Sequence, residues 1–270
     1  MKIGKATVAR TAICTSDAHT IVVRGHDLSK DLIGKVSFVE HFFLLLTGKL
    51  PTPGEAAVLN ATLVAIAEHG LVPSVQAARM TFAAAPDAMQ GAVAAGILGC
   101  GSVVLGSSET AGRMYAEIDA QVQAGTAVEA AALAVLQAWR AAGHSVPGYG
   151  HPLHKERDER VGALFAVARA AGTNLRFVAI AEAVEALLPQ VLGKPLKLNV
   201  SGAIPAVLLG AGFPVQALKG VPILARTAGL IAHLFEEIGQ PIGFALSYQA
   251  TREAVYDGRV PEGFGAAEKK

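Results

Sequence analysis

The chain has 270 residues, of which 52% are hydrophobic and 17% charged. This composition supplies a large core, and it excludes a disordered chain or a small protein that depends on disulfides. Because 23 basic residues are balanced by 22 acidic ones, we expect no nucleic-acid partner. Cys14 and Cys100 lie far apart without the spacing of metal ligands. We therefore expect no metal site, and both cysteines as small core residues of a reduced, cytoplasmic protein.

The first residues lack the uninterrupted apolar run of a secretory signal, which also favours a cytoplasmic location. Residues 91–106 are the longest weakly polar run and the one candidate for a membrane span. The run is shorter than the ~20 residues that a bilayer requires, and no Lys or Arg flanks it. We expect a buried helix there and no membrane partner.

The predicted elements begin with a short β-hairpin over residues 11–27, where β-branched residues alternate around a polar turn at Ser16 and Asp17. From Ser37 onward, apolar residues recur at spacings of three and four, and glycine ends several of these runs, as is typical of helices. Pro51 and Pro53 mark the start of one such helix. The pattern predicts an all-α fold with a small N-terminal hairpin.

Two Gly/Pro-rich stretches interrupt this helical pattern. The first, residues 143–154, precedes the charged run KERDER, and the second, residues 210–222, precedes the last apolar helix. They predict a large domain of residues 1–149 and 221–270 with a smaller domain, residues 150–220, inserted in it.

Three places hold basic side chains that need a partner. His69 ends a helix, where either a favourable interaction with the helix dipole or a ligand explains it. Two glycines and a proline precede His151, so that backbone can approach a ligand closely, although an interdomain turn would show the same pattern. Arg226 lies in an apolar helix, where a buried guanidinium needs a carboxylate from the protein or from a substrate.

Arginines and histidines without a pair of carboxylates indicate a site for a small polyanion and exclude glycosidase chemistry. The sequence contains no GxSxG, no Walker A sequence, no HExxH and no GxGxxG after a strand. Hydrolase, phosphoryl-transfer and dinucleotide-binding functions are therefore not supported.

Six segments, in order, resemble the citrate synthase family, and within it the citryl-CoA lyase type and the C-terminal part of ATP-citrate lyase. Together they cover nearly the whole chain: IVVRGHDLSKDLIGKVSFVEHFFLLLTGKLPT (21–52), EHGLVPSVQAAR (68–79), GSVVLGSSE (101–109), VPGYGHPLHKERDER (146–160), LKLNVSGAIPAVLLGAG (196–212) and LARTAGLIAHLFEE (224–237). The resemblance implies a citrate synthase fold, a large helical domain with a smaller mobile one. It further implies a homodimer that acts on a coenzyme A thioester and a di- or tricarboxylate, with no tightly bound cofactor.

The resemblance also assigns residues. It implies that His69 binds the dicarboxylate and that His151 hydrogen-bonds the oxaloacetate carbonyl or the citryl hydroxyl. Arg160, in DER where the family has DPR, and Arg226 match its carboxylate-binding arginines. The CoA adenine would rest on the backbone of five residues: Val146, Pro147, Gly148, Tyr149 and Gly150.

The chain departs from the family at three places. Val104 stands where citrate synthases carry the histidine of HGGAN, which favours the citryl-CoA lyase branch. Ser201 stands where the family has the aspartate of NVD, the base that takes a proton from acetyl-CoA. A serine hydroxyl cannot take a carbon-bound proton unaided, and a positioned base contributes on the order of 10²–10⁴ in rate. Arg252 and Arg259 are the candidates for the arginine that the family donates across the dimer.

The leading hypothesis is a citryl-CoA lyase-like enzyme that cleaves or forms the C–C bond of a 3-hydroxy-3-carboxyacyl-CoA, such as citryl-CoA. His151 would stabilise charge at the hydroxyl oxygen, and Ser201 with a bound water, or Glu109, would replace the missing acid/base. The alternative is a non-catalytic homologue that binds a CoA thioester and a dicarboxylate. A third hypothesis is an enzyme of the same fold that acts on another acyl-CoA.

Overall fold

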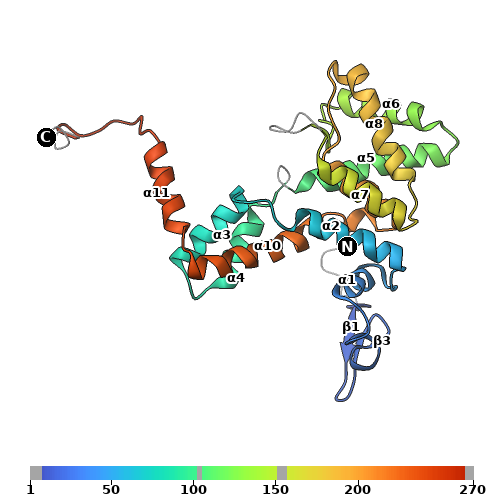
Figure 1. Ribbon diagram of the computed structural model, residues 1–270, viewed down its shortest axis with the longest axis horizontal. Helices are drawn as coiled ribbons and strands as arrows, with labels where there is room; N and C mark the ends of the chain where they lie inside the picture. The colour runs from blue at the N-terminus through green and yellow to red at the C-terminus, as the bar shows by residue number, and fades with distance from the viewer. Residues whose placement is uncertain (1–7, 102–104, 151–156, 265–270) are drawn as a thin grey trace. The chain divides into compact units, whose positions relative to one another are not determined.

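The structure, a computed structural model, describes residues 8–101, 105–150 and 157–264 (Figure 1). A small antiparallel sheet comes first, with strands in the order β1 (Cys14–Ser16), β2 (Ile21–Val23) and β3 (His26–Asp27). The predicted hairpin is therefore confirmed, and a third short strand, which pairs Val22 with Asp27, extends it.

Helices account for most of the remaining described residues, which confirms the all-α class. They are α1 (Phe38–Thr47), α2 (Pro53–Ala67), α3 (Pro73–Ala84), α4 (Met89–Leu98), α5 (Gly106–Gln123), α6 (Val128–Ala141), α7 (Glu159–Ala170), α8 (Arg176–Leu192), α9 (Val200–Gly210), α10 (Gly220–Gly239) and α11 (Gly243–Glu253). A π-helical turn, Leu28–Leu32, and a 3₁₀ turn, Val215–Ala217, complete the described elements.

The predicted helix start near Pro53 has a full capping box. The Thr52 side chain accepts a hydrogen bond from the Glu55 amide at 3.2 Å, and the Glu55 carboxylate accepts one from the Thr52 amide at 2.7 Å. Pro53 occupies the first helical position, where its missing N–H has no helical partner to lose. The sequence signal and the structure therefore agree residue by residue at this helix end.

The contacts group the chain into two compact units. Unit 1 comprises Met1–His69 and Cys100–Ala228, and unit 2 comprises Gly70–Gly99 and Gly229–Lys270. The predicted division into residues 1–149 with 221–270 and residues 150–220 does not follow these units. Because compactness says nothing about motion, the mobile small domain stays a prediction.

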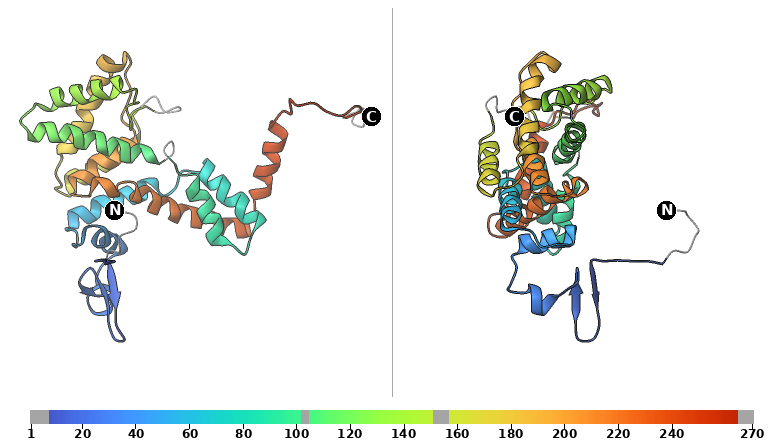
Figure 2. Two further views of the ribbon diagram at one scale, coloured as in Figure 1. Left: turned by 180° about the vertical axis from the view of Figure 1, so that it is seen from behind. Right: turned by 90° about the vertical axis from the view of Figure 1, so that its right-hand side faces the viewer.

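The core of unit 1 surrounds α9. Every residue from Gly202 to Leu209 is buried, and α9 packs against α2, α5, α7 and α8. Around it, α6 packs against both α5 and α8, and the left view of Figure 2 shows α8, in gold, crossing the two green helices α5 and α6. Helix α9 is therefore the central helix of unit 1.

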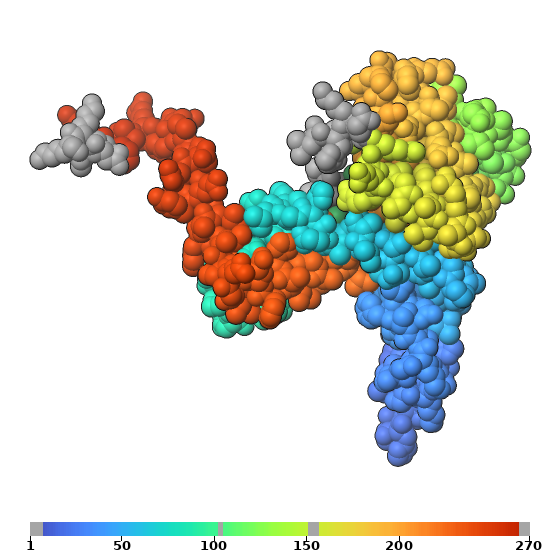
Figure 3. Space-filling model, viewed as in Figure 1, coloured from blue at the N-terminus to red at the C-terminus, as the bar shows by residue number. Residues whose placement is uncertain are grey.

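Unit 2 has its own smaller core, in which α3, α4 and the second half of α10 meet. Its buried members are Val75, Ala78, Phe82, Ala92, Leu230 and Leu234. A Cβ on Gly96 would lie 2.8 Å from both the Leu230 side chain and the Ser74 carbonyl oxygen, so α4 approaches its neighbours as closely as glycine allows. Helix α11 and the residues after it, red in the space-filling view of Figure 3, carry several exposed apolar side chains.

Two sequence expectations need correction. Cys100 is buried, but Cys14 is exposed, because it lies on a three-residue strand whose side chains are all exposed. Residues 91–106 do not form one buried helix: α4 ends at Leu98, and α5 begins at Gly106. Glycines at positions 99 and 101 coincide with this break.

Among the described residues, one helical stretch, Val215–Gly239, is long and apolar enough to cross a membrane, and 44% of its most apolar window is buried. The core helix of a globular protein gives the same signal. The stretch is therefore weak support for a membrane span.

Candidate active site

The predicted CoA-binding loop, residues 146–150, is held against the residues that precede α9. The Gly150 amide donates to the Lys197 carbonyl at 2.7 Å, and the Asn199 amide donates to the Gly148 carbonyl at 3.0 Å. Between these two bonds, Tyr149 pairs with Leu198 as an antiparallel bridge. The loop therefore has a fixed backbone rather than a freely moving one.

Asn199 ties the loop to the first turn of α9. Its side-chain nitrogen donates to the Gly150 carbonyl at 2.7 Å, while its side-chain oxygen accepts from the Ser201 amide at 2.9 Å. Asn199 is thus the N-cap of α9, as its residue type favours. Ser201, which is half-buried, is therefore linked to the loop through the Asn199 side chain.

Two glycines make the loop and α9 touch. Gly148 has a φ of +85°, and a Cβ there would lie 2.6 Å from the Gly202 Cα; a Cβ on Gly202 would lie 2.7 Å from the Gly148 carbonyl oxygen. Neither position has room for a side chain, and the left-handed φ of Gly148 also favours glycine. The structure thus brings the predicted loop and Ser201 together.

The side chains of the loop itself point elsewhere. Val146 and Tyr149 belong to the hydrophobic core of unit 1, with 8% and 7% of their surface exposed. A ligand on this loop would therefore meet backbone groups rather than these two side chains. This agrees with the expected backbone cradle, which stays a prediction.

Arg160 reaches the same region but already has a carboxylate partner. Its Nε and Nη2 donate to the two carboxylate oxygens of Asp158, the N-cap of α7, at 3.0 and 2.8 Å. The Val200 amide, in the first turn of α9, also donates to Asp158 at 3.4 Å. Burial raises the pKa of Asp158, but the hydrogen bonds and charge of Arg160 outweigh burial and hold the pKa below its ordinary value. Arg160 is therefore paired with a carboxylate of the protein, and its predicted role in binding a substrate carboxylate stays a prediction.

His69 and Arg160 are both located at the C-terminal end of α2. Arg160 Nη1 donates to the Ala65 carbonyl in the last turn of α2 at 3.4 Å. His69 follows that helix, one residue beyond its C-cap Glu68, and its amide donates to the Glu68 carboxylate at 2.8 Å. The exposed His69 and the Arg160 side chain therefore lie at the same end of α2.

Arg226 differs from Arg160 because its charge is unmatched. Only 5% of its surface is exposed, and its Nε and Nη1 are buried without a hydrogen-bond partner among the described residues. The expected burial of this guanidinium in an apolar helix is confirmed. The carboxylate that it needs is not supplied by the part of the chain that the structure describes.

His151 and Val104 lie outside the described residues, so their predicted roles stay predictions. Arg252 and Arg259 belong to unit 2, and both are exposed. Across the described ranges, no group of three or more His, Cys, Asp and Glu side chains could hold a metal ion.

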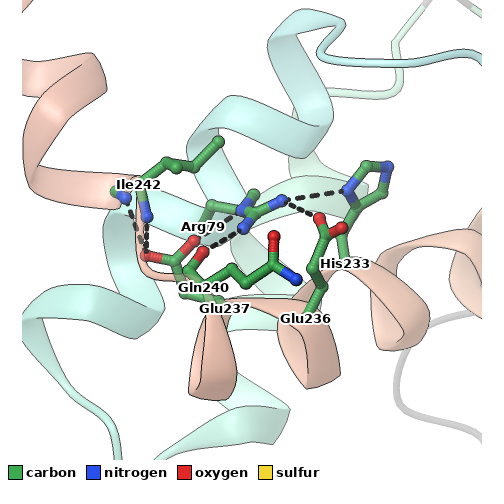
Figure 4. Close-up of polar contacts among 7 residues, drawn as sticks. Arg79, His233, Glu236, Glu237, Gln240 and Ile242 are labelled. Atoms are coloured by element: carbon green, nitrogen blue, oxygen red, sulfur yellow. Dashed lines mark hydrogen bonds and ion pairs between the residues drawn. The ribbon is translucent and has the colours of Figure 1, made fainter.

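A second concentration of charge lies in unit 2, around Arg79 (Figure 4). Arg79 Nε contacts Glu237 at 2.5 Å, Nη1 contacts Glu236 at 2.5 Å and lies 3.5 Å from His233 Nδ1, and Nη2 donates to the Gln240 carbonyl at 2.9 Å. With two carboxylates around one buried guanidinium, Arg79 needs no external anion. It is a structural residue of unit 2.

Sequence reasoning missed Asp158, Asn199 and Tyr115. Asp158 and Asn199 each stand directly before a helix, which is the N-cap signal. The Tyr115 hydroxyl lies 2.8 Å from that of Tyr149, and no pattern in the sequence links these residues, which are 34 positions apart.

Comparison with known proteins shows the family to which the chain belongs. Residues 52–242 match the family model for the C-terminal domain of citrate synthase. The structure of citryl-CoA lyase from Hydrogenobacter thermophilus is 33% identical with a TM-score of 0.82, and the match covers 98% of this chain and 100% of that one. No match is found among curated proteins.

Two more distant structures share the fold. ATP citrate lyase from Methanothrix soehngenii, in complex with citrate and coenzyme A, is 24% identical with a TM-score of 0.76, and the match covers 97% of this chain and 44% of that one. Citrate synthase from Thermoplasma acidophilum, in a ternary complex with carboxymethyl coenzyme A and oxaloacetate, is 21% identical with a TM-score of 0.63, over 86% of this chain and 60% of that one. The chain belongs to the citrate synthase family.

Proposed function

We propose that the protein is a citryl-CoA lyase-like enzyme that cleaves the C–C bond of a 3-hydroxy-3-carboxyacyl-CoA. The proposed substrate is citryl-CoA, and the proposed products are acetyl-CoA and oxaloacetate. The similarity to the Hydrogenobacter citryl-CoA lyase over the full length of both chains supports this choice. We further propose that the enzyme works in the cytoplasm.

The observation that carries the proposal is the unpartnered Arg226. Removing a cation from water is costly unless an anion and hydrogen bonds replace the lost hydration. Because Nε and Nη1 are buried and without a partner among the described residues, a carboxylate that binds there gains charge-assisted hydrogen bonds. A substrate with several carboxylates suits this site.

Arg160 would play a secondary part in binding. Its guanidinium is paired with Asp158, so a substrate carboxylate must either share Arg160 or displace Asp158. Nη1, which among the described residues makes only the long contact to Ala65, is the nitrogen most available for sharing. We expect Arg160 to contribute less to affinity than Arg226 for this reason.

The cleavage step requires a proton to leave the 3-hydroxyl group. As the bond between C2 and C3 breaks, its electron pair forms the enolate of acetyl-CoA, C3 becomes the ketone carbon of oxaloacetate, and C2 of the enolate then takes up a proton. In the proposed assignment, His151 faces the hydroxyl oxygen, accepts the proton that leaves it and stabilises the charge that changes there. Ser201, with a bound water, would deliver the proton to the enolate.

The contacts of the two candidate carboxylates, Glu109 and Asp158, favour Ser201 for this proton transfer. Glu109 is held in an ion pair with Arg113 at 2.6 Å. Asp158 has both oxygens on Arg160, and its lowered pKa keeps it ionised, so it carries no proton to deliver to the enolate. Ser201 lies in the first turn of α9, where helix amides favour negative charge such as that of an enolate.

We also propose a homodimer that forms through unit 2. Ile231, Phe235 and Ile238 line one face of α10 at spacings of four and three, and they are 47%, 75% and 63% exposed. Such an apolar stripe is typical of a surface that another chain covers. Static light scattering should give twice the monomer mass for the wild type, and the single-chain mass for Phe235→Asp.

The enzymatic proposal is tested by mixing the purified protein with citryl-CoA and measuring free acetyl-CoA and oxaloacetate. We expect turnover in the wild type and a loss of about 100-fold in kcat/KM for Arg226→Met. Arg169→Met, which removes an exposed arginine, is the matched control and should leave turnover unchanged. Release no faster than in a His151→Ala variant would contradict a lyase, and cleavage of malyl-CoA or citramalyl-CoA instead would indicate another acyl-CoA substrate.

Ser201 also favours a second candidate function, a non-catalytic homologue that binds a CoA thioester and a dicarboxylate. Calorimetric titration with coenzyme A and oxaloacetate separates the two candidates. Binding without turnover supports the non-catalytic homologue, whereas a lyase that lacks a strong base should gain activity in Ser201→Asp. Failure to bind either ligand would contradict both candidates.

A further inference from the structure

We propose that Tyr115 is a positioning residue, whose hydroxyl group fixes the 146–150 loop at the distance from α9 that binding of a coenzyme A thioester requires. The proposal rests on the proposed function for the identity of the ligand. The position of the loop itself can be measured without a ligand.

Three buried groups form a directed chain of hydrogen bonds. The Tyr149 hydroxyl donates to the Ala181 carbonyl of α8 at 2.9 Å, and the Tyr115 hydroxyl of α5 lies 2.8 Å from that of Tyr149. A hydroxyl has only one hydrogen to donate. Because Tyr149 gives its hydrogen to Ala181, Tyr115 must be the donor to Tyr149.

This chain determines where the loop lies. Tyr149 is the one loop residue between the two backbone bonds, from Gly150 to Lys197 and from Asn199 to Gly148. Its side chain runs from that point into the core and ends between α5 and α8. Two sets of contacts thus fix the loop: the hydrogen bonds of the Tyr149 side chain in the core, and the backbone bonds to the residues before α9.

Tyr115 also lies directly against the turn that carries Ser201. A Cβ on Gly202 would lie 3.0 Å from the Tyr115 hydroxyl oxygen and 2.5 Å from the Leu198 side chain. One hydroxyl group therefore touches the loop anchor Tyr149 and the residue next to Ser201. Removal of this hydroxyl should loosen the loop and α9 relative to each other.

The tyrosine chain keeps its protons throughout the neutral range. Both side chains are buried, with Tyr115 0% and Tyr149 7% exposed. Burial raises the pKa of each hydroxyl above its ordinary value. Both groups thus remain neutral donors around neutral pH.

The test variant is Tyr115→Phe, which removes the hydroxyl and keeps the ring. The matched control is Ile118→Val, a small change at a fully buried position one turn further along α5, which lowers stability and keeps the Tyr115 hydroxyl. In the ligand-free protein, hydrogen exchange is measured for peptides that contain the Gly150 and Asn199 amides, with a peptide from α6 as the internal reference. We expect exchange of these two amides to be about five- to tenfold faster in Tyr115→Phe and unchanged in Ile118→Val.

The second measurement uses coenzyme A as the titrant and citryl-CoA as the substrate. We expect Tyr115→Phe to raise the Kd of coenzyme A and the KM of citryl-CoA about fivefold, with kcat at saturation changed less than twofold. A merely structural role would lower the Tm of both variants and move neither Kd nor KM. Loop exchange that is unchanged in Tyr115→Phe, or equally faster in Ile118→Val, overturns the proposal.

The two proposals fail in different ways. If the wild type binds no coenzyme A, the proposed function fails, and with it the ligand that we assign to the loop. The exchange measurement still decides whether Tyr115 fixes the loop.

Discussion

Arg79 and Glu237 form a buried ion pair, in which Nε and Oε2 are 2.5 Å apart and both side chains are only 2% exposed. The other carboxylate oxygen of Glu237 accepts from the Ile242 and Gly243 amides at 2.9 and 2.7 Å. One carboxylate therefore joins α3 to the beginning of α11. This relationship makes the pair a determinant of unit 2 stability.

Removal of the Arg79 guanidinium should lower the stability of unit 2. We expect Arg79→Met to lower the free energy of unfolding by about 3–5 kcal/mol, because two carboxylates then lose their buried counter-ion. The exposed pair of Arg113 and Glu109 is the control, and Arg113→Met should cost less than about 1 kcal/mol. Urea titrations followed by circular dichroism give both values, and equal costs would show that the pair in unit 2 contributes no more than a surface pair.

Acid should weaken the same pair. Burial raises the pKa of Glu237, but the Gly243 amide, the Arg79 side chain and the Ile242 amide together hold the pKa below its ordinary value of 4.5. The carboxylate thus contributes stability that is present above pH 4.5 and is lost as the pH falls through the pKa of the folded state. The free energy of unfolding, measured between pH 6 and pH 3, should fall more steeply for the wild type than for Glu237→Gln; parallel curves would be the contrary result.

The unmatched charge of Arg226 predicts an unusual effect on stability. In the absence of ligand, Arg226→Met should raise the free energy of unfolding by about 1 kcal/mol or more, because it removes a buried cation whose Nε and Nη1 have no partner among the described residues. Citrate should raise the Tm of the wild type by mass action but not that of the variant. Thermal denaturation with and without citrate measures both effects, and Arg169→Met, at an exposed arginine, is the control. A variant that is less stable than the wild type would mean that Arg226 has a partner in the protein.

The contact of Gly148 with Gly202 can be separated from backbone strain. Gly143 has a φ of +78° with nothing within 4 Å of its Cβ position, whereas at Gly148, with a φ of +85°, the Cβ would lie 2.6 Å from Gly202 Cα. We expect Gly143→Ala to cost about 1 kcal/mol and Gly148→Ala about 3 kcal/mol, since overpacking adds to strain. Unfolding in urea measures the difference, and equal costs would rule out the steric contribution.

Local sequence signals predicted the helices well, because they act within a few residues. Pro51 and Pro53 predicted a helix start that the structure confirms, and the burial of Arg226 followed from its apolar neighbours. The exposure of Cys14 was missed, because a strand three residues long gives no reliable burial pattern. Signals with a range of one helical turn cannot report which distant segments share a core.

The partners of charged side chains were the least predictable part of the site. We expected Arg160 to bind a substrate carboxylate and did not foresee its ion pair with Asp158, two positions away, because the position of Asp158 before a helix predicts an N-cap but not a side-chain partner. The same limit explains why Tyr115 was missed and why Arg79 was not recognised as a neutralised residue, since its glutamates lie more than 150 positions away.

Helix α9 is buried on all sides from Gly202 to Leu209 and packs against four helices of its unit. A helix in that setting cannot turn or slide without opening contacts in every direction at once, so it is the immobile axis of unit 1. Adaptation to substrates of different length must then fall on the loops around this axis. Among enzymes that share this arrangement, selectivity for the acyl chain should vary with loop sequence while the axis stays in place.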